Sequence, residues 1–142
     1  MSTTKTALHT FAEWSATTDQ DHRANTQVAV ESFVDTIGCI AAGVDAELPS
    51  RVRDYVDAGV DGPCPVLFSS MRTTRELSAF VNATNGHAIE LDDWDQATEA
   101  HMSTVIIPAL LALSEHAGAT GADVIDSYLV GLEVAMHFGE AL

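Results

Sequence analysis

The sequence predicts an all-α protein, a bundle of several helices that forms one domain over residues 1–142. Apolar residues recur with helical spacing through most of the chain, and helix start and stop signals separate these segments. Apolar residues make up 46% of the chain but aromatic residues only 6%. The core is therefore expected to consist mainly of Ala, Val, Leu and Ile side chains.

Two helices are expected before residue 44. The apolar residues within 8–14 predict a short first helix, and a polar break follows in which Asp21 is a suitable N-cap. A second helix is predicted from residue 23 to about 42, ended by Gly43. Its inward face is expected at i, i+3, i+4, i+7 and i+11, which are Val30, Phe33, Val34, Ile37 and Ala41.

Two shorter helices and a loop are expected in the middle of the chain. Pro49 opens the third helix and Gly59 ends it. Its expected inward residues are Val52, Tyr55 and Val56. Residues 59–70 are rich in Gly and Pro and predict a loop, with a short extended piece at 66–68. Thr73 begins the fourth helix, which runs to about His87, because residues 73–76 match a capping box.

The last two helices are strongly apolar. Ser103 is predicted to cap the fifth helix, Pro108 to delay its start or bend it, and Gly118 to end it. Thr120 with Asp123 is predicted to cap the sixth helix. Both helices are apolar around most of their circumference, so each is expected to be buried on nearly every side. They need more partner surface than the other helices offer, which predicts a missing downstream domain or a partner chain in a homo- or hetero-oligomer.

The net charge of −15 excludes some classes of partner. Nucleic acids and anionic membrane surfaces require clustered Lys and Arg, and this chain has six such residues against 21 acids. The acidity is typical either of a solvated, self-repelling surface or of a salt-rich cytoplasm. Two isolated cysteines, Cys39 and Cys64, and a polar N-terminus without a signal sequence indicate a reduced cytoplasmic location.

The segment most suited to chemistry lies between the fourth and fifth helices, and we call residues 87–103 the junction. Its chemical groups are His87, Glu90, Asp92, Asp93, Trp94 and His101. Carboxylates and imidazoles collected between rigid elements are suited to proton transfer or metal binding. His101 precedes a helix N-terminus, where an anion is favoured, so a carboxylate substrate held there suits proton abstraction next to a carboxylate.

Structural explanations compete with each of these assignments. Glu90 and Asp92 are also typical of a solvated turn, Asp93 of an N-cap, and Trp94 of a packing anchor. His87 is also typical of a helix end. A metal site formed by His87, Glu90, Asp93 and His101 matches no standard zinc or di-iron spacing, so no metal is expected. The sequence contains no phosphate loop, nucleophile elbow or dinucleotide fingerprint.

Four segments resemble motifs of the MmgE/PrpD family, which includes 2-methylcitrate dehydratase and cis-aconitate decarboxylase. Residues 29–43 (AVESFVDTIGCIAAG) resemble the family's "DTLGCALAG" helix, and residues 80–93 (FVNATNGHAIELDD) resemble its "NGTxxHxLDxDD" signature. Residues 101–109 resemble "HPSxxxxPA", and residues 118–142 resemble "GASGxxLxxAYxxGxEVxxRxGxAL". The resemblance covers nearly the whole chain.

The resemblance implies part of a large helical domain and a lyase that uses neither a metal nor an organic cofactor. The implied substrate is a small polycarboxylate such as 2-methylcitrate. Catalytic roles then fall to Asp92, Asp93 and His101, and substrate-binding roles to His87, Glu90 and Trp94. Glu90 stands where the decarboxylases have an aspartate, Trp94 where many members have a threonine, and Met102 where proline is usual.

Family members are about three times longer, so the resemblance implies that a further helical segment and an α+β domain are absent. A polycarboxylate also needs several cations, and none of the six Lys and Arg residues lies in the junction. We therefore expect the chain to need a further domain or a partner polypeptide for activity. The alternative is a non-catalytic remnant or interaction module with the same fold. A third hypothesis is a small carboxylate-bridged metal protein.

Overall fold

The computed structural model describes residues 6–18, 25–57 and 60–141. Within these ranges the chain forms six α-helices and one small antiparallel sheet, which confirms the predicted all-α class. The helices are α1 (Ala7–Thr17), α2 (Thr26–Gly43), α3 (Glu47–Asp57), α4 (Arg75–His87), α5 (Ser103–Ala117) and α6 (Gly121–Glu140). The sheet pairs β1 (Cys64–Pro65) with β2 (Arg72–Thr73).

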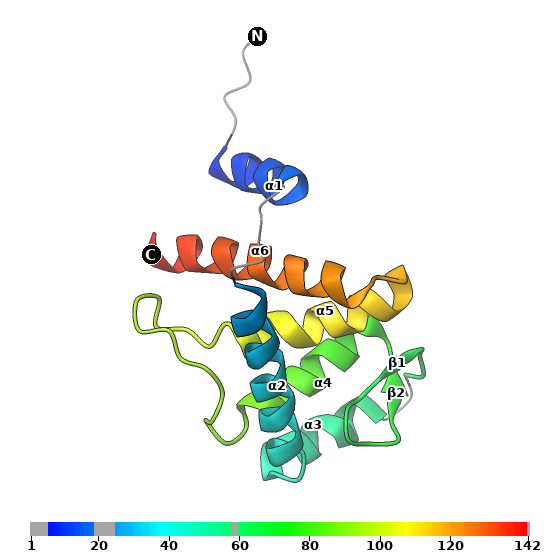
Figure 1. The fold of residues 1–142 in the computed structure, drawn as a ribbon. Helices are drawn as coiled ribbons and strands as arrows, with labels where there is room; N and C mark the ends of the chain where they lie inside the picture. The colour runs from blue at the N-terminus through cyan, green and yellow to red at the C-terminus, as the bar shows by residue number, and fades with distance from the viewer. Residues whose placement is uncertain (1–5, 19–24, 58–59, 142) are drawn as a thin grey trace.

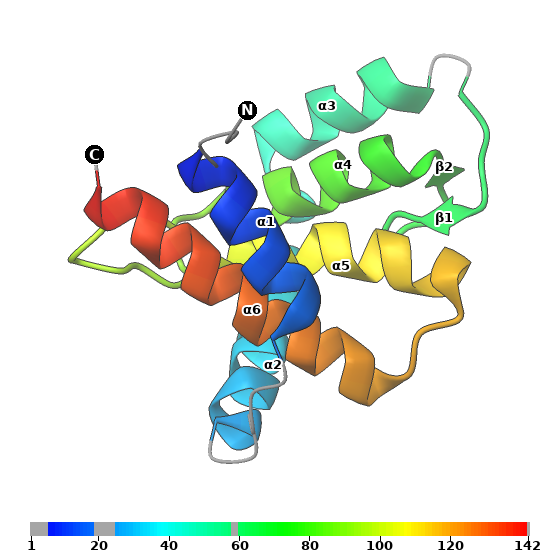
Figure 2. The same cartoon turned by 90° about the horizontal axis from the view of Figure 1, so that it is seen from above.

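The helices α3, α4, α5 and α6 follow one another across the molecule, and α2 packs across α4, α5 and α6 (Figure 1). The short helix α1 lies on the outer side of α6 (Figure 2). One buried cluster, around Ala29, Ile107 and Tyr128, joins α2, α5 and α6. A second cluster, around Val56, Val66 and Val81, joins α3 and α4 to the loop after β1. The junction leaves α4 on the side of the molecule opposite the sheet (Figure 1).

Helix α2 buries a different face from the predicted one. Its buried residues are Ala29, Thr36, Cys39, Ile40 and Gly43, whereas Val34 is 68% exposed. Small side chains on this face allow α4 to approach closely, because a Cβ added at Gly43 would lie only 2.0 Å from the carbonyl oxygen of Asn85. The buried face of α2 is therefore the one whose small residues let its backbone approach α4, not the one with the largest apolar side chains.

Three further predictions about the middle of the chain were wrong in detail. Tyr55 is 81% exposed rather than inward-facing. The paired strands flank residues 66–68 instead of including them. Thr74, not Thr73, caps α4 by accepting a hydrogen bond from the Leu77 N–H. Thr73 is buried in β2, where its hydroxyl donates to the Val60 carbonyl. The predictions for Asp21 and Gly59 lie outside the described residues.

For α5 and α6, the predicted helix ends agree with the structure better than the predicted burial does. Gly118 ends α5 in the left-handed conformation at φ 63°, and Thr120 with Asp123 forms the predicted capping box of α6. Ser103, however, is the first residue of α5 rather than its cap. Val105 is 65% exposed, so burial of α5 on every side is not observed. Pro108 lies buried inside α5, within its first two turns.

Among the described helices, none is by itself both long and apolar enough to cross a membrane. The helices α2 and α3 meet the length and composition requirement only as a pair, bent by 87° at the break between them.

Candidate active site

The junction gathers its chemical groups around the end of α4 and the start of α5. His87 is the last residue of α4, and Met102, immediately before α5, is buried. The intervening chain forms turns held by an isolated bridge between Asp95 and Ala100. These two rigid helices bring residues 87 and 101 together although 14 positions separate them.

Asp92 is the centre of the candidate site. Its side chain is fully buried, and its Oδ2 atom lies 3.1 Å from His87 Nδ1 and 3.2 Å from His101 Nδ1. His87 Nδ1 also lies within hydrogen-bonding distance of both carboxylate oxygens. A buried carboxylate is costly unless it has such partners. The two imidazoles are therefore part of the reason that Asp92 can occupy this position.

His101 is surrounded by groups that fix its ring. Its centroid lies 4.6 Å from that of His87 and 5.0 Å from that of Trp94, and both contacts are edge-on. The His101 side chain is 22% exposed, whereas Trp94 is 55% exposed. His101 Nδ1 is buried and makes no hydrogen bond with suitable geometry, although Asp92 is close. Trp94 thus shields one side of His101 while its own outer face remains accessible.

Asp93 faces a different partner from its neighbour Asp92. Its carboxylate accepts hydrogen bonds from the Ser103 backbone N–H at 3.1 Å and from the Ser103 hydroxyl at 2.7 Å. The same hydroxyl lies 2.8 Å from the Tyr128 hydroxyl of α6. Asp93 therefore satisfies the N-terminus of α5 from ten residues away, a structural role in accord with the N-cap alternative. Its predicted catalytic role stays a prediction.

Glu90 lies at the exposed edge of the site. Its backbone has φ 54°, a left-handed conformation that is costly for a residue with a Cβ. Its Oε1 atom lies 3.4 Å from His87 Nε2, the ring nitrogen that faces away from Asp92. His87 thus has one carboxylate at each ring nitrogen, one buried and one exposed.

The outer turn of the junction is anchored to α6. Asp95 accepts hydrogen bonds from the Thr98 hydroxyl and backbone N–H, and these bonds, the hydroxyl first, lower the pKa of Asp95. Gly139 of α6 lies against Thr98, where an added Cβ would come within 2.5 Å of the Thr98 Cβ. The close approach places the end of α6 beside the junction (Figure 2).

Cys39 of α2 lies near enough to the junction for the carboxylates there to affect the pKa of its thiol. Burial raises the pKa of the Cys39 thiol, and the negative charges of Asp35, Asp92 and Asp93 raise it further. A thiol in such surroundings is disfavoured as a thiolate nucleophile. The groups suited to acid–base chemistry at the junction are therefore its imidazoles and carboxylates.

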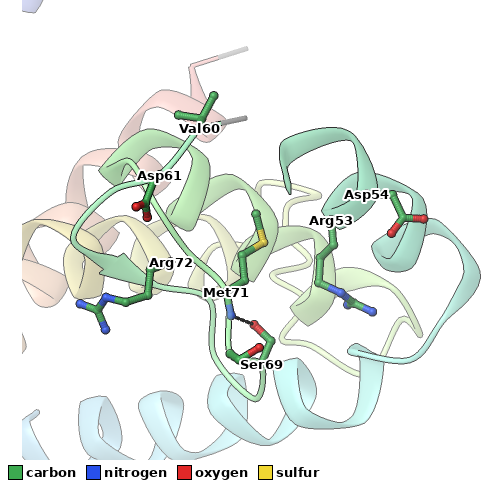
Figure 3. Close-up of a pocket in the computed structure, with 8 residues that line it drawn as sticks. Arg53, Asp54, Val60, Asp61, Ser69, Met71 and Arg72 are labelled. Atoms are coloured by element: carbon green, nitrogen blue, oxygen red, sulfur yellow. Dashed lines mark hydrogen bonds between the residues drawn. The ribbon is translucent and has the colours of Figure 1, made fainter. Parts of the chain in front are cut away.

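A larger, open pocket lies elsewhere among the described residues, between α3 and the loop that joins β1 to β2. It measures about 710 Å³ and is open and polar. Figure 3 shows Arg53 and Arg72 at opposite sides of it, pointing away from each other. Arg53 donates to the Val44 carbonyl and Arg72 to the Pro63 carbonyl. We place the candidate site at the junction, because ionisable groups converge there and not in this pocket.

The structure thus brings His87, Asp92 and His101 together, whereas Asp93 is hydrogen-bonded to Ser103 at the start of α5. Two supporting residues were not recognised in the sequence as parts of the site, namely Ser103 as a partner of Asp93 and Tyr128 as the partner of Ser103. The signal for Tyr128 was its hydroxyl, since a tyrosine on an apolar helix requires a hydrogen-bonding partner when buried. The metal-ligand set considered from the sequence also changes, because Asp92 replaces Glu90 and Asp93 in the cluster.

Curated proteins resemble this chain in sequence. The cis-aconitate decarboxylase-like protein oryM of Aspergillus oryzae is 27% identical over 124 residues, which cover 82% of this chain and 26% of that protein. The cis-aconitate decarboxylase of Aspergillus terreus is 31% identical over 119 residues, 78% of this chain and 24% of that enzyme. The chain thus spans about a quarter of the length of these curated relatives. No solved structure matches it significantly.

The match to a family model is more extensive than the match to either relative. Residues 9–142 match the MmgE/PrpD N-terminal domain, and this range includes α2, α4, the junction, α5 and α6. The chain therefore belongs to the MmgE/PrpD family and carries its N-terminal domain.

Proposed function

We infer that this chain is the N-terminal helical part of a lyase that acts on a small polycarboxylate, such as 2-methylcitrate or cis-aconitate. The observation that supports this inference is the buried Asp92 carboxylate within 3.2 Å of two imidazoles. It lies in the segment that carries the family's Asp-rich signature. The names of the fungal relatives favour decarboxylation, and the wider family favours dehydration.

In this proposal His101 transfers the proton. In a dehydration, a base removes a proton from the carbon next to a carboxylate, and the hydroxyl leaves as water after an acid protonates it. In a decarboxylation, the C–C bond to the departing carboxylate breaks and an acid protonates the carbon that keeps the electron pair. Asp92 positions the His101 ring and compensates the positive charge that the ring gains with a proton.

The other junction residues have supporting roles. Asp93 holds the N-terminus of α5 through Ser103, and in this way keeps His101 in register with that helix. The accessible groups at the edge of the site, His87, Glu90 and Trp94, contact the substrate. The acid–base work thus falls on His101 and Asp92.

The charge of the junction supports the need for another polypeptide. Residues 87–103 contain no Lys or Arg but five carboxylates, at Glu90, Asp92, Asp93, Asp95 and Glu99. A polycarboxylate would be repelled here unless cations were added, and each charge-assisted bond to Arg or Lys contributes about 1.5–3 kcal/mol. We infer that the remaining part of the enzyme, in the same chain or as a partner in an oligomer, supplies these cations.

The test combines this chain with the polypeptide that corresponds to the rest of its relatives. Dehydration of 2-methylcitrate and decarboxylation of cis-aconitate are then assayed with each component alone and with both. We expect activity only in the mixture, reduced about 100-fold or more by His101→Ala in a variant that circular dichroism shows to be folded at the assay temperature. His116→Ala, at an exposed position on α5, is the matched control. The absence of any rate gain in the mixture would count against the proposal.

The second candidate function is an interaction module without catalysis. It is favoured by the lack of cations in the junction and by large apolar side chains on the outside of the fold, including Leu91, Val34 and Val105, each at least 65% exposed. The same variant distinguishes the two. If His101 is only structural, His101→Ala lowers the melting temperature and leaves any activity of the mixture unchanged.

A further inference from the structure

We propose that Tyr128 of α6 is a positioning residue for the proton transfer by His101, an inference that rests on the proposed function. The Tyr128 hydroxyl lies 2.8 Å from the Ser103 hydroxyl. Ser103 in turn donates a hydrogen bond of 2.7 Å to the Asp93 carboxylate. Because Tyr128 is only 2% exposed, it acts through these two residues and not by contact with the substrate.

The hydrogen bonds of this series run in one direction only. The Ser103 hydroxyl has a single proton, which it donates to the Asp93 carboxylate. The Ser103 oxygen must therefore accept in its contact with Tyr128, and the Tyr128 hydroxyl is the donor. Successive hydrogen bonds that run in the same direction polarise and strengthen one another. Loss of the Tyr128 hydroxyl therefore weakens the bond that holds Asp93.

The ring of Tyr128 is held in place by its neighbours. It belongs to the buried cluster with Ala29 and Ile107, and it packs edge-on against Phe33, with the ring centroids 5.4 Å apart. A tyrosine in such apolar surroundings needs a partner for its hydroxyl, and Ser103 is that partner. The contacts of the ring fix the direction of the hydroxyl, which makes Tyr128 a fixed reference point for the start of α5.

The bond between Asp93 and Ser103 lies directly beside the central contact of the candidate site. Asp92 immediately precedes Asp93 in the chain. His101 lies two residues before Ser103. The two pairs thus connect the same two stretches of the junction, so release of one pair shifts the backbone that carries the other. The distance of 3.2 Å between Asp92 Oδ2 and His101 Nδ1 therefore depends on Ser103. A displacement of about 1 Å can reduce a catalysed rate about 100-fold.

Helix α6 supports the junction at a second point on the same face. Gly139 lies against Thr98, where an added Cβ would come within 2.5 Å of the Thr98 Cβ. Residues 128 and 139 are separated by about three helical turns, so both lie on one face of α6. This face thus holds the junction at its outer turn and again where the chain enters α5.

The first experiment measures the lyase activity of the mixture of this chain with the rest of the enzyme, using Tyr128→Phe. This variant keeps the ring and its contact with Phe33 and removes only the hydroxyl. We expect kcat to fall about 10-fold and KM to change less than about twofold, because the hydroxyl orients His101 without contacting the substrate. Tyr55→Phe is the matched control. Tyr55 on α3 is 81% exposed, so its variant should leave both constants unchanged.

A double-variant cycle tests whether the effect passes through Ser103. Ser103→Ala should lower kcat at least as much as Tyr128→Phe. The chain with both substitutions should be no slower than Ser103→Ala alone, because residues that act in one series are not additive. Circular dichroism checks the fold of each variant, and Ser103→Ala replaces Tyr128→Phe if the latter does not fold.

The imidazoles report the same connection without a substrate. NMR of the ring nitrogens in the 142-residue chain should show that the His101 signals move in Tyr128→Phe, because the contact with Asp92 changes. The signals of His116, which is exposed on α5, should not move. A purely structural Tyr128 would lower the melting temperature and leave the His101 signals and kcat unchanged.

Three outcomes in the mixture would overturn the proposal. These are a folded Tyr128→Phe variant with the kcat of the unmodified chain, a change in KM alone, and a double variant in which the two single losses multiply. If the mixture with the unmodified chain is inactive, the proposed function fails, and the NMR comparison then decides whether Tyr128 positions His101. In that case unchanged His101 signals overturn the positioning role, and displaced signals support it.

Discussion

The junction before α5 and the turn before α6 solve the same problem in different ways. Each must satisfy the exposed N–H groups at the start of a helix. At α6, Thr120 and Asp123 cap the helix within four consecutive residues, and both lie at the surface. At α5, Asp93 reaches Ser103 across ten residues, and the bond is linked to Tyr128 of α6. A local cap leaves the turn short and simple, whereas a distant cap holds a long loop in which Asp92 and two imidazoles come together.

The largest expected difference in stability concerns two glycines, one packed beside the start of the junction and one in the turn before α6. Gly43→Ala should lower the free energy of unfolding by about 3 kcal/mol, because the new Cβ would overlap the Asn85 carbonyl where α4 enters the junction. Gly118→Ala should cost about 1 kcal/mol, because nothing lies within 4 Å and only the left-handed backbone opposes it. Urea denaturation measures both, with Gly38→Ala in the open middle of α2 as a control. If the two substitutions lowered the free energy of unfolding equally, the effect at Gly43 would not come from its contact with α4.

A smaller difference is expected for the caps themselves. Asp93→Ala should lower the free energy of unfolding by about 2–3 kcal/mol, because it removes charge-assisted hydrogen bonds and leaves the Ser103 N–H unsatisfied. Thr120→Ala should cost about 1 kcal/mol, as expected for an exposed helix cap. Urea denaturation at neutral pH measures both. If Asp93→Ala were as stable as the unmodified chain, the hydrogen bonds between Asp93 and Ser103 would not contribute to stability.

The smallest expected effect is a pH dependence of the α6 cap. The Thr120 hydroxyl and backbone N–H donate to Asp123 and lower its pKa below the ordinary value. The carboxylate therefore contributes stability above its unfolded pKa, and this contribution is lost as the pH falls through the folded pKa. Asp123→Asn should thus be destabilising at neutral pH and nearly neutral well below the usual carboxyl pKa of about 4.

Paired denaturation curves at the two pH values measure this change. Asp126→Asn, at an exposed position one turn later on α6, serves as the control. A destabilisation by Asp123→Asn that is equally large in acid would show that the carboxylate charge has no role in the cap.

The same contrast explains which parts of the structure could be predicted. The α6 cap and the Gly118 stop were predicted correctly because each depends on a few consecutive residues. The buried face of α2 was predicted wrongly, because Gly43 and Ala29 are buried by the close approach of other helices and not by their own hydrophobicity. In the junction, the sequence indicated which residues bear the chemistry. It left open whether Asp92 or Asp93 faces the site, since adjacent residues in an irregular turn have no periodicity to separate them.

The sequence by itself determined the helical class, the Gly118 stop, the α6 cap and the family, because periodicity, local capping patterns and motif spacing are carried by neighbouring residues. The tertiary structure alone decided that Asp92 is buried between His87 and His101 while Asp93 turns to Ser103. That choice depends on where α4, α5 and α6 pack, because only their packing places a helix N-terminus beside one carboxylate and two imidazoles beside the other.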